Sequence, residues 1–468
     1  MLTSSGQRLK IMVFVDLDIT IRHFIKTGAF HELEKHHDLV YVFNEDCTSE
    51  KKAVNTDPKS LGLREIRLTS IPRSRTGAWF PLYMATVLRQ QRGLPNYKAR
   101  KADATRQSSR GFIFKSLLRG IPGIYQIYRR RVIGRLGIDA SVENLIRCER
   151  PEIILHPSTL NGYYINELMQ VAQKFDIPFI LLMNSWDNPS AKAVCTGLPT
   201  KLVVWGEQSR QHAMAYMLMP EDRIEVFGAA QFQVYRSPPP YSREELCRFF
   251  RVPSDKKVIL YAGAGSGRHE TVYLRMLERA VQEGPLGGCH VLYRPHPWRG
   301  GLGEGEEDFF AHSWNGVSMD PHMEEYYKAE VANPTGRVCM IDYAVSNMLL
   351  TLVDAVISPL STMLVEAMTL GKPILVFFPQ EYHDMELSTD EVHFADLIAV
   401  PDVNVSLNSG EFTAAVERLK GQIGDSSLSE RLRESSRFFH VLDGPTYAER
   451  LDALVASVYA EKRNRVQA

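Results

Sequence analysis

Cysteines and net charge are scarce in this sequence, and each shortage excludes a class of protein. The six cysteines of the 468-residue chain are scattered and form no C-x-x-C pair. This argues against a disulfide framework or a structural zinc site and predicts a reducing compartment. The 55 basic and 55 acidic residues cancel, so the molecule as a whole gives no indication of nucleic-acid binding.

Long hydrophobic segments are also missing. The apolar run that follows Lys10 is short and ends in acidic residues, so it fits neither the core of a signal peptide nor a membrane span. No other segment reaches the roughly 18 apolar residues that a spanning helix needs. We therefore expect a cytoplasmic protein.

The order of apolar and amphipathic segments predicts an α/β fold. Strands that are apolar throughout and alternate with helices are typical of a parallel sheet covered on both faces. The candidate strands of the first half are 9–15, 38–43, 64–71, 151–156, 177–183, 201–206 and 223–227. Those of the second half are 256–265, 289–297, 354–361 and 372–379. The Gly- and Glu-rich stretch 300–335 is expected to be an insertion or a long loop.

A proline cluster separates the two halves. Pro238, Pro239 and Pro240 are consecutive, and such a run continues neither a helix nor a central strand, so it indicates a linker. The chain is also too long for one ordinary domain. We predict one Rossmann-like domain over 1–235, a second over 236–440 and a closing segment over 441–468.

Basic residues are concentrated in one stretch. Residues 89–135 hold thirteen Lys or Arg and a single acid, Asp103. Within 111–137, aromatic and aliphatic residues are interleaved with the cations, a composition that suits the surface of an anionic membrane. The alternative is a solvated basic helix whose apolar side packs on its own domain. Nucleic acid is disfavoured because no recognised binding module surrounds the stretch.

The first apolar run ends in a phosphatase-like motif. Asp16-Leu17-Asp18-Ile19-Thr20 matches the D-x-D-x-T pattern of haloacid-dehalogenase-type phosphatases. Such an enzyme also needs a Ser or Thr after its next strand and a late acidic pair for magnesium. The next predicted strand ends at Phe43-Asn44, and Asp354 is solitary. The phosphatase hypothesis is therefore disfavoured, and we assign no metal to this motif.

The stretch 357–377 carries the clearest candidate binding site. Ser361 and Thr362 stand where a predicted strand gives way to a helix, where hydroxyls and backbone N–H groups can hold a phosphate. Glu366 follows on that helix, and its carboxylate can accept both hydroxyls of a ribose. The simpler alternative is a capped helix with an exposed Glu366.

Two further strand ends carry candidate donor-binding residues. Arg294 and His296 follow the strand 289–297, and a cation beside an imidazole suits a diphosphate or a nucleobase edge. The glycine-rich turn YAGAGSGRHE (261–270) would let backbone approach a phosphate. Its candidate contacts are Gly263, Ser266 and Arg268. Glycines that serve helix packing are the alternative.

These motifs together resemble the GT-B glycosyltransferases, in particular the bacterial surface-polysaccharide and CDP-glycerol glycerophosphotransferase-like branch. The resemblance rests on RPHP (294–297), on the S-x-x-S-T-x-x-x-E-A-x-x-x-G-K-P pattern (358–373), and on 21–43, 203–213, 223–235 and 443–455. It implies two Rossmann-like domains that face a cleft, a metal-independent reaction, and a C-terminal helix that crosses back to the N-terminal domain. The segments 89–135 and 300–335 depart from the family pattern.

The same resemblance places an acceptor on the first domain. Arg22 and His23 follow the first strand, in a loop that lies over the cleft in this family. Trp186, Asp187 and Asn188 follow another predicted strand, where an aromatic ring with polar neighbours suits a sugar or polyol. His23 and Asp187 are rival candidates for the general base that activates an acceptor hydroxyl. A simple Asp-Asn-Pro turn is the alternative for 187–189.

The expected function is transfer of a sugar from a nucleoside-diphosphate donor to a glycan or lipid-linked acceptor, in cell-surface glycan or glycolipid synthesis. No cofactor and no metal are assigned. The enzyme would be cytoplasmic or peripheral on the inner face of the membrane. The alternatives are a polyol-phosphate transferase of the same fold, a non-hydrolysing UDP-sugar 2-epimerase, and a non-catalytic protein that binds nucleotide sugars.

Overall fold

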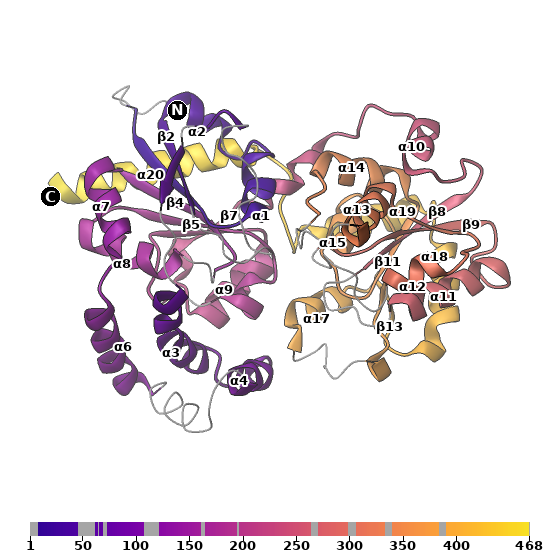
Figure 1. Cartoon of the computed structure of the whole chain (residues 1–468), viewed down its shortest axis with the longest axis horizontal. Coiled ribbons are helices and arrows are strands. Elements are labelled where there is room, and N and C mark those ends of the chain that lie inside the picture. Colours follow the sequence, from indigo (N-terminus) through magenta and orange to yellow (C-terminus); the bar gives the residue numbers. More distant parts are fainter. Residues whose placement is uncertain are drawn as a thin grey trace. The chain divides into compact units, whose positions relative to one another are not determined.

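The chain divides into two compact units, each with its own parallel sheet (Figure 1). The computed structural model describes residues 8–44, 61–63, 65–68, 73–106, 121–160, 164–193, 196–263, 270–297, 306–332, 339–382 and 390–467. The first unit comprises Met1–Gln233, Leu387–His393 and Phe439–Ala468. The second comprises Val234–Glu386 and Phe394–Phe438.

The first unit is built on a seven-stranded sheet in the order β3-β2-β1-β4-β5-β6-β7, and all its strand pairs are parallel. The central strands are buried along almost their whole length, as expected for a sheet covered on both faces. The strands are β1 (Lys10–Val15), β2 (Asp38–Asn44), β3 (Glu65–Leu68), β4 (Ile153–Ser158), β5 (Phe179–Met183), β6 (Lys201–Val204) and β7 (Ile224–Val226).

The second unit repeats the arrangement with a six-stranded parallel sheet in the order β10-β9-β8-β11-β12-β13. Its strands are β8 (Lys257–Ala262), β9 (Cys289–Arg294), β10 (Val317–Met319), β11 (Ala355–Ser358), β12 (Ile374–Phe377) and β13 (Asn404–Ser406). Both orders are those of a Rossmann fold. The prediction of two Rossmann-like domains is confirmed.

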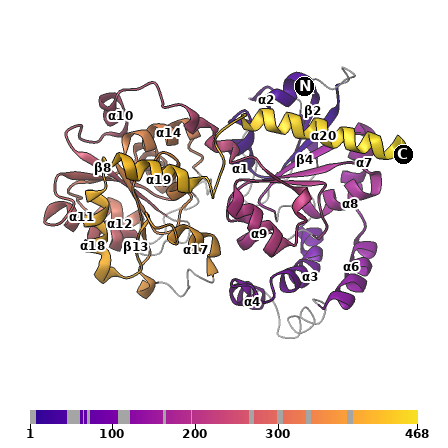
Figure 2. The same cartoon turned by 180° about the vertical axis from the view of Figure 1, so that it is seen from behind.

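Helices connect the strands and cover both sheets (Figures 1 and 2). The helices up to residue 217 are α1 (Asp18–Thr20), α2 (His31–His36), α3 (Arg73–Gln90), α4 (Tyr97–Arg106), α6 (Pro122–Leu136), α7 (Ala140–Glu149), α8 (Ile165–Phe175) and α9 (Glu207–Met217). Those that follow are α10 (Arg243–Phe250), α11 (Glu270–Gln282), α12 (Glu306–Ala311), α13 (Pro321–Ala332), α14 (Tyr343–Leu352), α15 (Met363–Thr369), α17 (Val392–Ile398), α18 (Phe412–Gly421), α19 (Ser426–Ser436) and α20 (Tyr447–Gln467).

The C-terminal helix α20 belongs to the first unit, as the sequence predicted. Its buried residues Tyr447, Leu451 and Val455 join the apolar core formed by β1, β2 and β4. Both views show α20 beside α2 (Figures 1 and 2). Burial of large apolar side chains is worth about 1.5–3 kcal/mol each, so this helix contributes substantially to the first unit.

Two glycines let the returning chain approach the first sheet. A Cβ at Gly206 would lie 2.5 Å from the backbone carbonyl carbon of Phe439, and one at Gly228 would lie 1.8 Å from the carbonyl oxygen of Val441. Val441 N–H also donates to the carbonyl of Trp205, at 3.0 Å. The close backbone contact therefore depends on the absence of side chains at these two positions.

The described part of the segment 300–335 is not a long loop, which was one of the two expectations for it. Its described part contains α12, α13 and the edge strand β10, which pairs with β9. Phe309, Val317 and Tyr327 are buried in the core of the second unit. The loop expectation was wrong because β10 has only three residues, too few to produce a visible apolar run in the sequence. The alternative expectation of an insertion stays a prediction.

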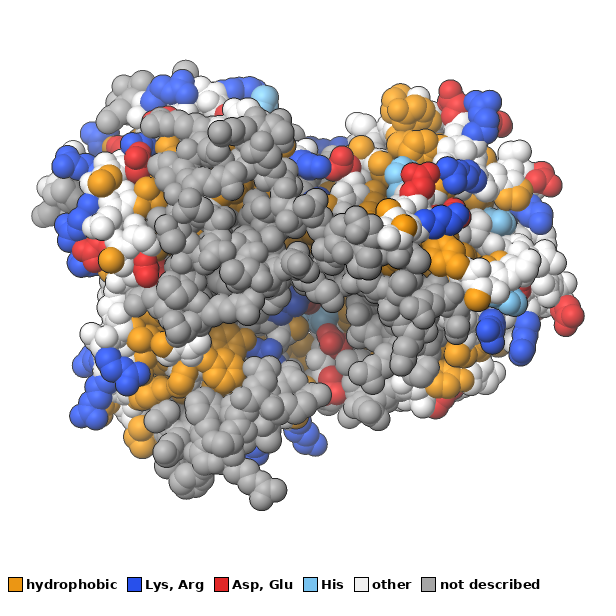
Figure 3. Space-filling model, viewed as in Figure 1, with side chains coloured by type: hydrophobic (Ala, Val, Ile, Leu, Met, Phe, Trp, Pro, Cys, Tyr) orange, Lys and Arg blue, Asp and Glu red, His pale blue; other side chains and the backbone are white. Residues whose placement is uncertain are grey.

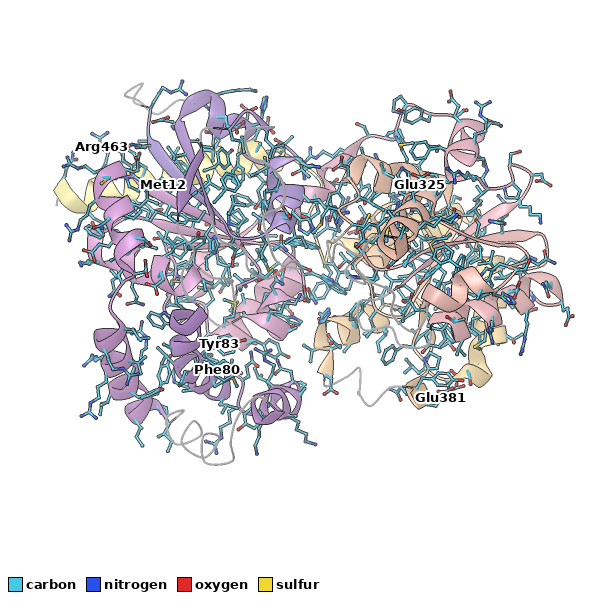
Figure 4. All side chains as sticks on the ribbon, in the orientation of Figure 1. Met12, Phe80, Tyr83, Glu325, Glu381 and Arg463 are labelled. Carbon is cyan, nitrogen blue, oxygen red and sulfur yellow. The ribbon has the colours of Figure 1, made fainter. Side chains whose placement is uncertain are left out.

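The described parts of the basic segment 89–135 form helices on the first unit. Trp79 and Leu82 of α3 pack with Tyr125 and Val132 of α6 in a separate apolar cluster. Figure 4 shows Phe80 and Tyr83 together on α3, where their rings stack at 6.0 Å. Residues 107–120, which include part of the predicted membrane segment 111–137, lie outside the described residues. Among the described helices, none combines the length and the apolar composition needed to cross a membrane.

We expect Gly228→Ala to destabilise the first unit strongly. Gly228 has φ +86° and meets a carbonyl oxygen, so the substitution combines backbone strain with overpacking, a loss of about 3 kcal/mol or more. Gly93→Ala is the matched control, because Gly93 has φ +85° and a Cβ there would meet nothing within 4 Å. It should cost roughly 1–2 kcal/mol. Chemical denaturation measures both, and equal losses would contradict the close contact with Val441.

Candidate functional site

The order of strands in the second sheet reverses between β8 and β11. Ligands of such sheets bind outside the carboxyl ends of the strands, at this topological switch point. Gly263 follows β8 directly, and Ser361 follows β11 after a short turn. Ser358 ties the two strands together because its hydroxyl donates to the carbonyl of Ala262, at 2.7 Å. The switch point is therefore a well-fixed edge on which the predicted donor residues are placed.

Glu366 lies buried on α15, next to this edge. Its side chain is 4% exposed, so the alternative of a solvent-exposed Glu366 is wrong. A buried carboxylate must be compensated by hydrogen bonds or charge, and the hydroxyl of Tyr235 donates to its Oε2. Tyr235, 6% exposed, lies just before the proline-rich linker. No local sequence pattern links Tyr235 to Glu366, because the two residues are 131 positions apart.

Ser361 and Thr362 precede α15 and are both half-buried. The Ser361 hydroxyl accepts a hydrogen bond from Met363 N–H, at 3.2 Å, and keeps its own proton to donate. Thr362 stands at the N-cap in a helical conformation and makes no side-chain capping bond. The two hydroxyls therefore lie at the surface of the same edge as Glu366, as the motif predicted.

Arg294 is buried in an ion pair at the end of β9. Its Nε donates to Asp320 Oδ2 at 2.6 Å, and its Nη1 donates to the Ser346 hydroxyl at 3.2 Å. Its Nη2 is buried and has no hydrogen-bond partner within the described part of the chain. Burial raises the pKa of Asp320, but the charge of Arg294 and hydrogen bonds from His322 outweigh it and lower the pKa to about 2. Both partners are therefore charged.

The glycine-rich turn is described only in part. Gly263 N–H donates to the Arg294 carbonyl at 2.9 Å, and a Cβ at Gly263 would lie 2.5 Å from the carboxylate of Glu270. Ser266 and Arg268, the other candidates of this turn, lie outside the described residues. His296 is half-buried two residues beyond Arg294. The absence of a side chain at Gly263 thus makes room for the buried carboxylate of Glu270. Oε2 of Glu270 accepts a hydrogen bond from the Tyr293 hydroxyl.

The first sheet has its own switch point, between β1 and β4. His23 lies in the helical turn Ile21–Ile25 beyond β1 and is 6% exposed. Its Nδ1 is 2.8 Å from Oδ1 of Asn184, which follows β5 directly. Burial, then the charge of the half-buried Arg22, lower the pKa of His23 to about 3. His23 is therefore a neutral imidazole that Asn184 orients.

Asp16 and His156 form a second polar pair at this switch point. Nε2 of His156 lies 3.9 Å from Oδ2 of Asp16, and its Nδ1 lies 2.9 Å from the carbonyl of Phe14. Asp16 is 1% exposed. The first carboxylate of the D-x-D-x-T motif is therefore buried beside His156.

Asp187 is held by a neighbouring lysine. Its Oδ2 lies 2.7 Å from Nζ of Lys192. Burial raises the pKa of Asp187, but the charges of Lys192 and His393 outweigh it and lower the pKa to about 2. The fully buried Asn188 accepts from Ser185 N–H at 2.9 Å and donates to Asp187. Asn188 therefore shapes the turn, in agreement with the Asp-Asn-Pro alternative.

Trp186 is in the interior, which corrects the expectation of an exposed aromatic platform. Its side chain is 1% exposed, and its ring makes edge contacts with His393 at 4.9 Å and with Phe439 at 5.6 Å. No local pattern could reveal this, because both contacts come from segments far away along the chain. Trp186 has no surface available for stacking on a sugar in this arrangement.

Sequence reasoning overlooked several polar residues of the two edges. Asn184 and Asp320 each follow a strand directly, and His156 interrupts the apolar strand β4. A polar residue immediately after a predicted strand was the available signal for Asn184, whereas Asp320 follows a strand that the sequence did not predict. No sequence signal pairs Arg294 with Asp320, because β10 itself was not recognised.

The fold has solved relatives, although sequence comparison found none. No protein-family model matches the chain, and no curated protein shows significant similarity. The UDP-GlcNAc 2-epimerase of Neisseria meningitidis bound to UDP-GlcNAc is 12% identical over 96% of this chain and 99% of its own, with a TM-score of 0.51. S. aureus MnaA with UDP is 11% identical over 95% of both chains, with a TM-score of 0.53. The glycosyltransferase of kitacinnamycin is 11% identical over 97% and 99%, with a TM-score of 0.51.

These likenesses show the fold. The chain has the GT-B fold, as the motif resemblance predicted, and the structures that share it include both epimerases and glycosyltransferases. At such low sequence identity the structural similarity assigns no role to any residue of this chain.

We expect His23 to reduce stability at acid pH. The unfolded residue has a pKa near 6.5, whereas the folded one titrates at about 3. Between these values the unfolded chain binds the extra proton, so stability falls as pH falls, by about 1.4 kcal/mol per pH unit. In His23→Gln, the decline of the free energy of unfolding between pH 6 and pH 4 should be shallower by about this amount per pH unit.

Chemical unfolding of the first unit at several pH values measures the slope. His31→Gln, at an exposed position, is the control and should keep the wild-type pH dependence. An unchanged slope in His23→Gln would show that His23 is not buried as a neutral group.

Proposed function

We propose that the protein is a glycosyltransferase whose second unit binds a nucleoside-diphosphate sugar. The observation that carries the proposal is the buried carboxylate of Glu366 beside the β8–β11 switch point. Ribose offers two adjacent hydroxyl donors, and the several acceptor positions of a carboxylate match them. Ser361 and Thr362 are at the same edge, where their hydroxyls can donate to phosphate oxygens.

Arg294 supports the diphosphate in this proposal. Two of its donors are committed to Asp320 and Ser346, and within the described residues the buried Nη2 is available for an anionic oxygen. A hydrogen bond to a charged group contributes about 1.5–3 kcal/mol. The ion pair fixes the guanidinium, so binding would cost little side-chain entropy. His296, Gly263, Ser266 and Arg268 remain proposed neighbours of the donor.

His23 is the general base that we favour for the acceptor hydroxyl. Asn184 Oδ1 is an acceptor, so it selects the tautomer with a proton on Nδ1 and leaves Nε2 to accept a proton. A base with a pKa of about 3 is weak, but an anionic substrate nearby would raise that pKa. Asp187 remains the rival, although Lys192 stabilises its charged form.

The acceptor is proposed to be a glycan or a lipid-linked glycan that binds near Arg22 and His23 at the carboxyl edge of the first sheet. Contact with an anionic membrane through 111–137 would bring a lipid-linked acceptor to the enzyme. Acid–base transfer of this kind needs no metal when protein groups stabilise the charge of the leaving diphosphate.

A UDP-sugar 2-epimerase is the second candidate. The observation that favours it is the presence of such an epimerase, bound to UDP-GlcNAc, among the structures of the same fold. An epimerase would use the same nucleotide-binding edge but would convert its sugar nucleotide without an acceptor. The two candidates therefore differ in the requirement for a second substrate.

We expect one of UDP, CDP, GDP and dTDP to raise the melting temperature of the wild type, because a ligand that binds only the folded state stabilises it. Glu366→Gln should weaken this nucleotide roughly 10–100-fold, since it removes charge-assisted hydrogen bonds to ribose. Glu417→Gln, at an exposed position of α18, is the control and should bind normally.

The variant Tyr235→Phe tests whether nucleotide affinity depends on the Glu366 carboxylate itself or on its internal hydrogen bond. This substitution removes the hydrogen bond from the Tyr235 hydroxyl to Glu366 but keeps the carboxylate. Nucleotide affinity should therefore change only a few-fold. If no nucleotide shifts the melting temperature of the wild type, the donor site is wrongly assigned.

We expect His23→Gln to retain nucleotide binding and to lose turnover about 100-fold or more, the typical contribution of a general base. Asp187→Asn should keep most of the activity. Turnover of the matching sugar nucleotide with and without acceptor extracts measures both, by chromatography of the products. Conversion that needs no acceptor would favour the epimerase, and loss of turnover in Asp187→Asn alone would assign the base to Asp187.

A further inference from the structure

The amino edge of the first sheet carries a cavity that the proposed chemistry does not use. The cavity, of about 910 Å³, includes Phe179 and Lys201, the first residues of β5 and β6. Asn184, the partner of His23, follows the opposite end of β5. The cavity therefore lies across the sheet from the candidate reaction edge. Its volume is at the upper end of the range of about 300–1,000 Å³ that is typical of sites for organic ligands.

A buried side chain of the lining has polar atoms to offer to a ligand. Gln170 of α8 lines the cavity and is 8% exposed. Among the described residues, none forms a hydrogen bond with its side-chain amide. A buried amide normally has a partner, because its removal from water costs free energy that a hydrogen bond compensates. The amide of Gln170 can therefore both donate to and accept from a molecule in the cavity.

Cations outnumber acids in the cavity lining. The basic residues are Arg89, Arg129, Lys201, Arg223 and Arg465, and the acids are Asp176, Asp222 and Glu461. Lys201 Nζ lies 2.7 Å from Glu225 Oε1, and Arg465 Nη2 lies 3.8 Å from Glu461 Oε2. The three other arginines have no acidic partner within the described part of the chain. The lining therefore favours a ligand with negative charge.

Two of these arginines are half-buried and oriented by backbone carbonyls. Arg129 Nε donates to the carbonyl of Thr196 at 2.6 Å, and Arg223 Nη1 donates to the carbonyl of Pro199 at 3.2 Å. Figure 3 shows basic side chains beside hydrophobic ones in the region of α6, the helix that carries Arg129. A guanidinium has five N–H donors, so each arginine keeps donors that fit a carboxylate or a phosphate.

The lining also offers hydrogen-bond acceptors, so a simple anion would use only part of it. Helices α8 and α9 end at the cavity, where Asp176 and Leu218 are their C-terminal caps. The last carbonyls of a helix accept hydrogen bonds and carry partial negative charge. Glutamine amides both donate and accept, and the lining holds Gln90, Gln126, Gln170 and Gln173. Hydroxyl groups have the same double capacity, so a ligand rich in hydroxyls matches this lining.

The aromatic residues of the lining do not favour a nucleotide. Among the described residues that line the cavity, the aromatic ones are Tyr125 and Phe179, which are 4% and 2% exposed. The guanidinium of Arg89 lies 4.8 Å from the centre of the Tyr125 ring. A nucleobase is commonly held by stacking on an aromatic ring, and neither ring has a face to offer. An apolar ligand is disfavoured too, because it would leave Gln170 unpaired.

We propose that this cavity is a binding site for an acidic oligosaccharide. Arg129 and Arg223 hold a carboxylate or phosphate group of the sugar chain, and Gln170 binds a hydroxyl of a neighbouring sugar. The five residues of β5 separate the two edges by roughly 17 Å, so a ligand that engages both edges must be extended. The site would hold a distant part of the acceptor or product. This role rests on the proposed function, whereas binding itself does not.

Calorimetric titration of the full chain with defined oligosaccharides tests the proposal. The probes are the tetrasaccharides of galacturonic acid and of hyaluronan, which are acidic, and maltotetraose, which is neutral. At least one acidic tetrasaccharide should bind, and maltotetraose should bind at least tenfold more weakly. Gln170→Leu and Arg129→Gln should each weaken binding roughly tenfold or more, since each removes hydrogen bonds to the ligand.

Arg131→Gln is the matched control. Arg131 is exposed on the same helix as Arg129 but does not line the cavity, so this variant should bind like the wild type. Unchanged melting temperatures establish that the variants fold. If Gln170→Leu does not fold, Arg129→Gln and Arg223→Gln decide the question.

Two outcomes would overturn the proposal. One is a wild type that binds neither acidic tetrasaccharide; if tripolyphosphate then binds and Arg129→Gln abolishes its binding, the cavity is a site for small anions. The other is binding that survives in all the folded cavity variants. The test is separate from that of the proposed function. Oligosaccharide binding by a chain that no nucleoside diphosphate stabilises would refute the donor site alone, whereas nucleotide binding without oligosaccharide binding would refute this inference alone.

Discussion

The parallel direction of every strand in both sheets is the constraint on which the rest depends. A parallel sheet is stable only when both faces are covered, so its strands are apolar throughout and its polar side chains are placed beyond the strand ends. All carboxyl ends then meet at one edge. This is why Asp16 and Asn184, 168 positions apart, belong to one polar edge in the first unit, and why Gly263, Arg294 and Ser361 belong to one edge in the second.

The buried polar groups of these edges are held by specific partners. Removing charge from water is expensive unless an opposite charge or hydrogen bonds compensate it. Asp320 compensates Arg294, Lys192 compensates Asp187, and Tyr235 donates to Glu366. The partners also limit what each group can do. Among the described residues Arg294 keeps one nitrogen, Nη2, that is buried without a hydrogen-bond partner.

The sequence was sufficient for the fold and for the position of the proposed donor residues Ser361 and Glu366 along the chain. Periodicity located the central strands, and the pattern around Ser361 and Glu366 placed them after β11. It was insufficient where a side chain's environment depends on distant segments. Trp186 looked like a surface aromatic because Phe439, which covers it, comes from the far end of the chain. The strand β10 was missed because three residues carry too little pattern, and Asp320 was missed with it.

The two edges of the first sheet differ in the environment they give to charged groups. Its carboxyl edge holds His23 in a nearly water-free environment that keeps the imidazole neutral, a condition in which nearby charge strongly affects proton affinity. Its amino edge differs, because Arg89, Arg129, Lys201, Arg223 and Arg465 line a cavity there. The two edges are separated by the length of the strands, and the charge that lowers the pKa of His23 is that of its neighbour Arg22.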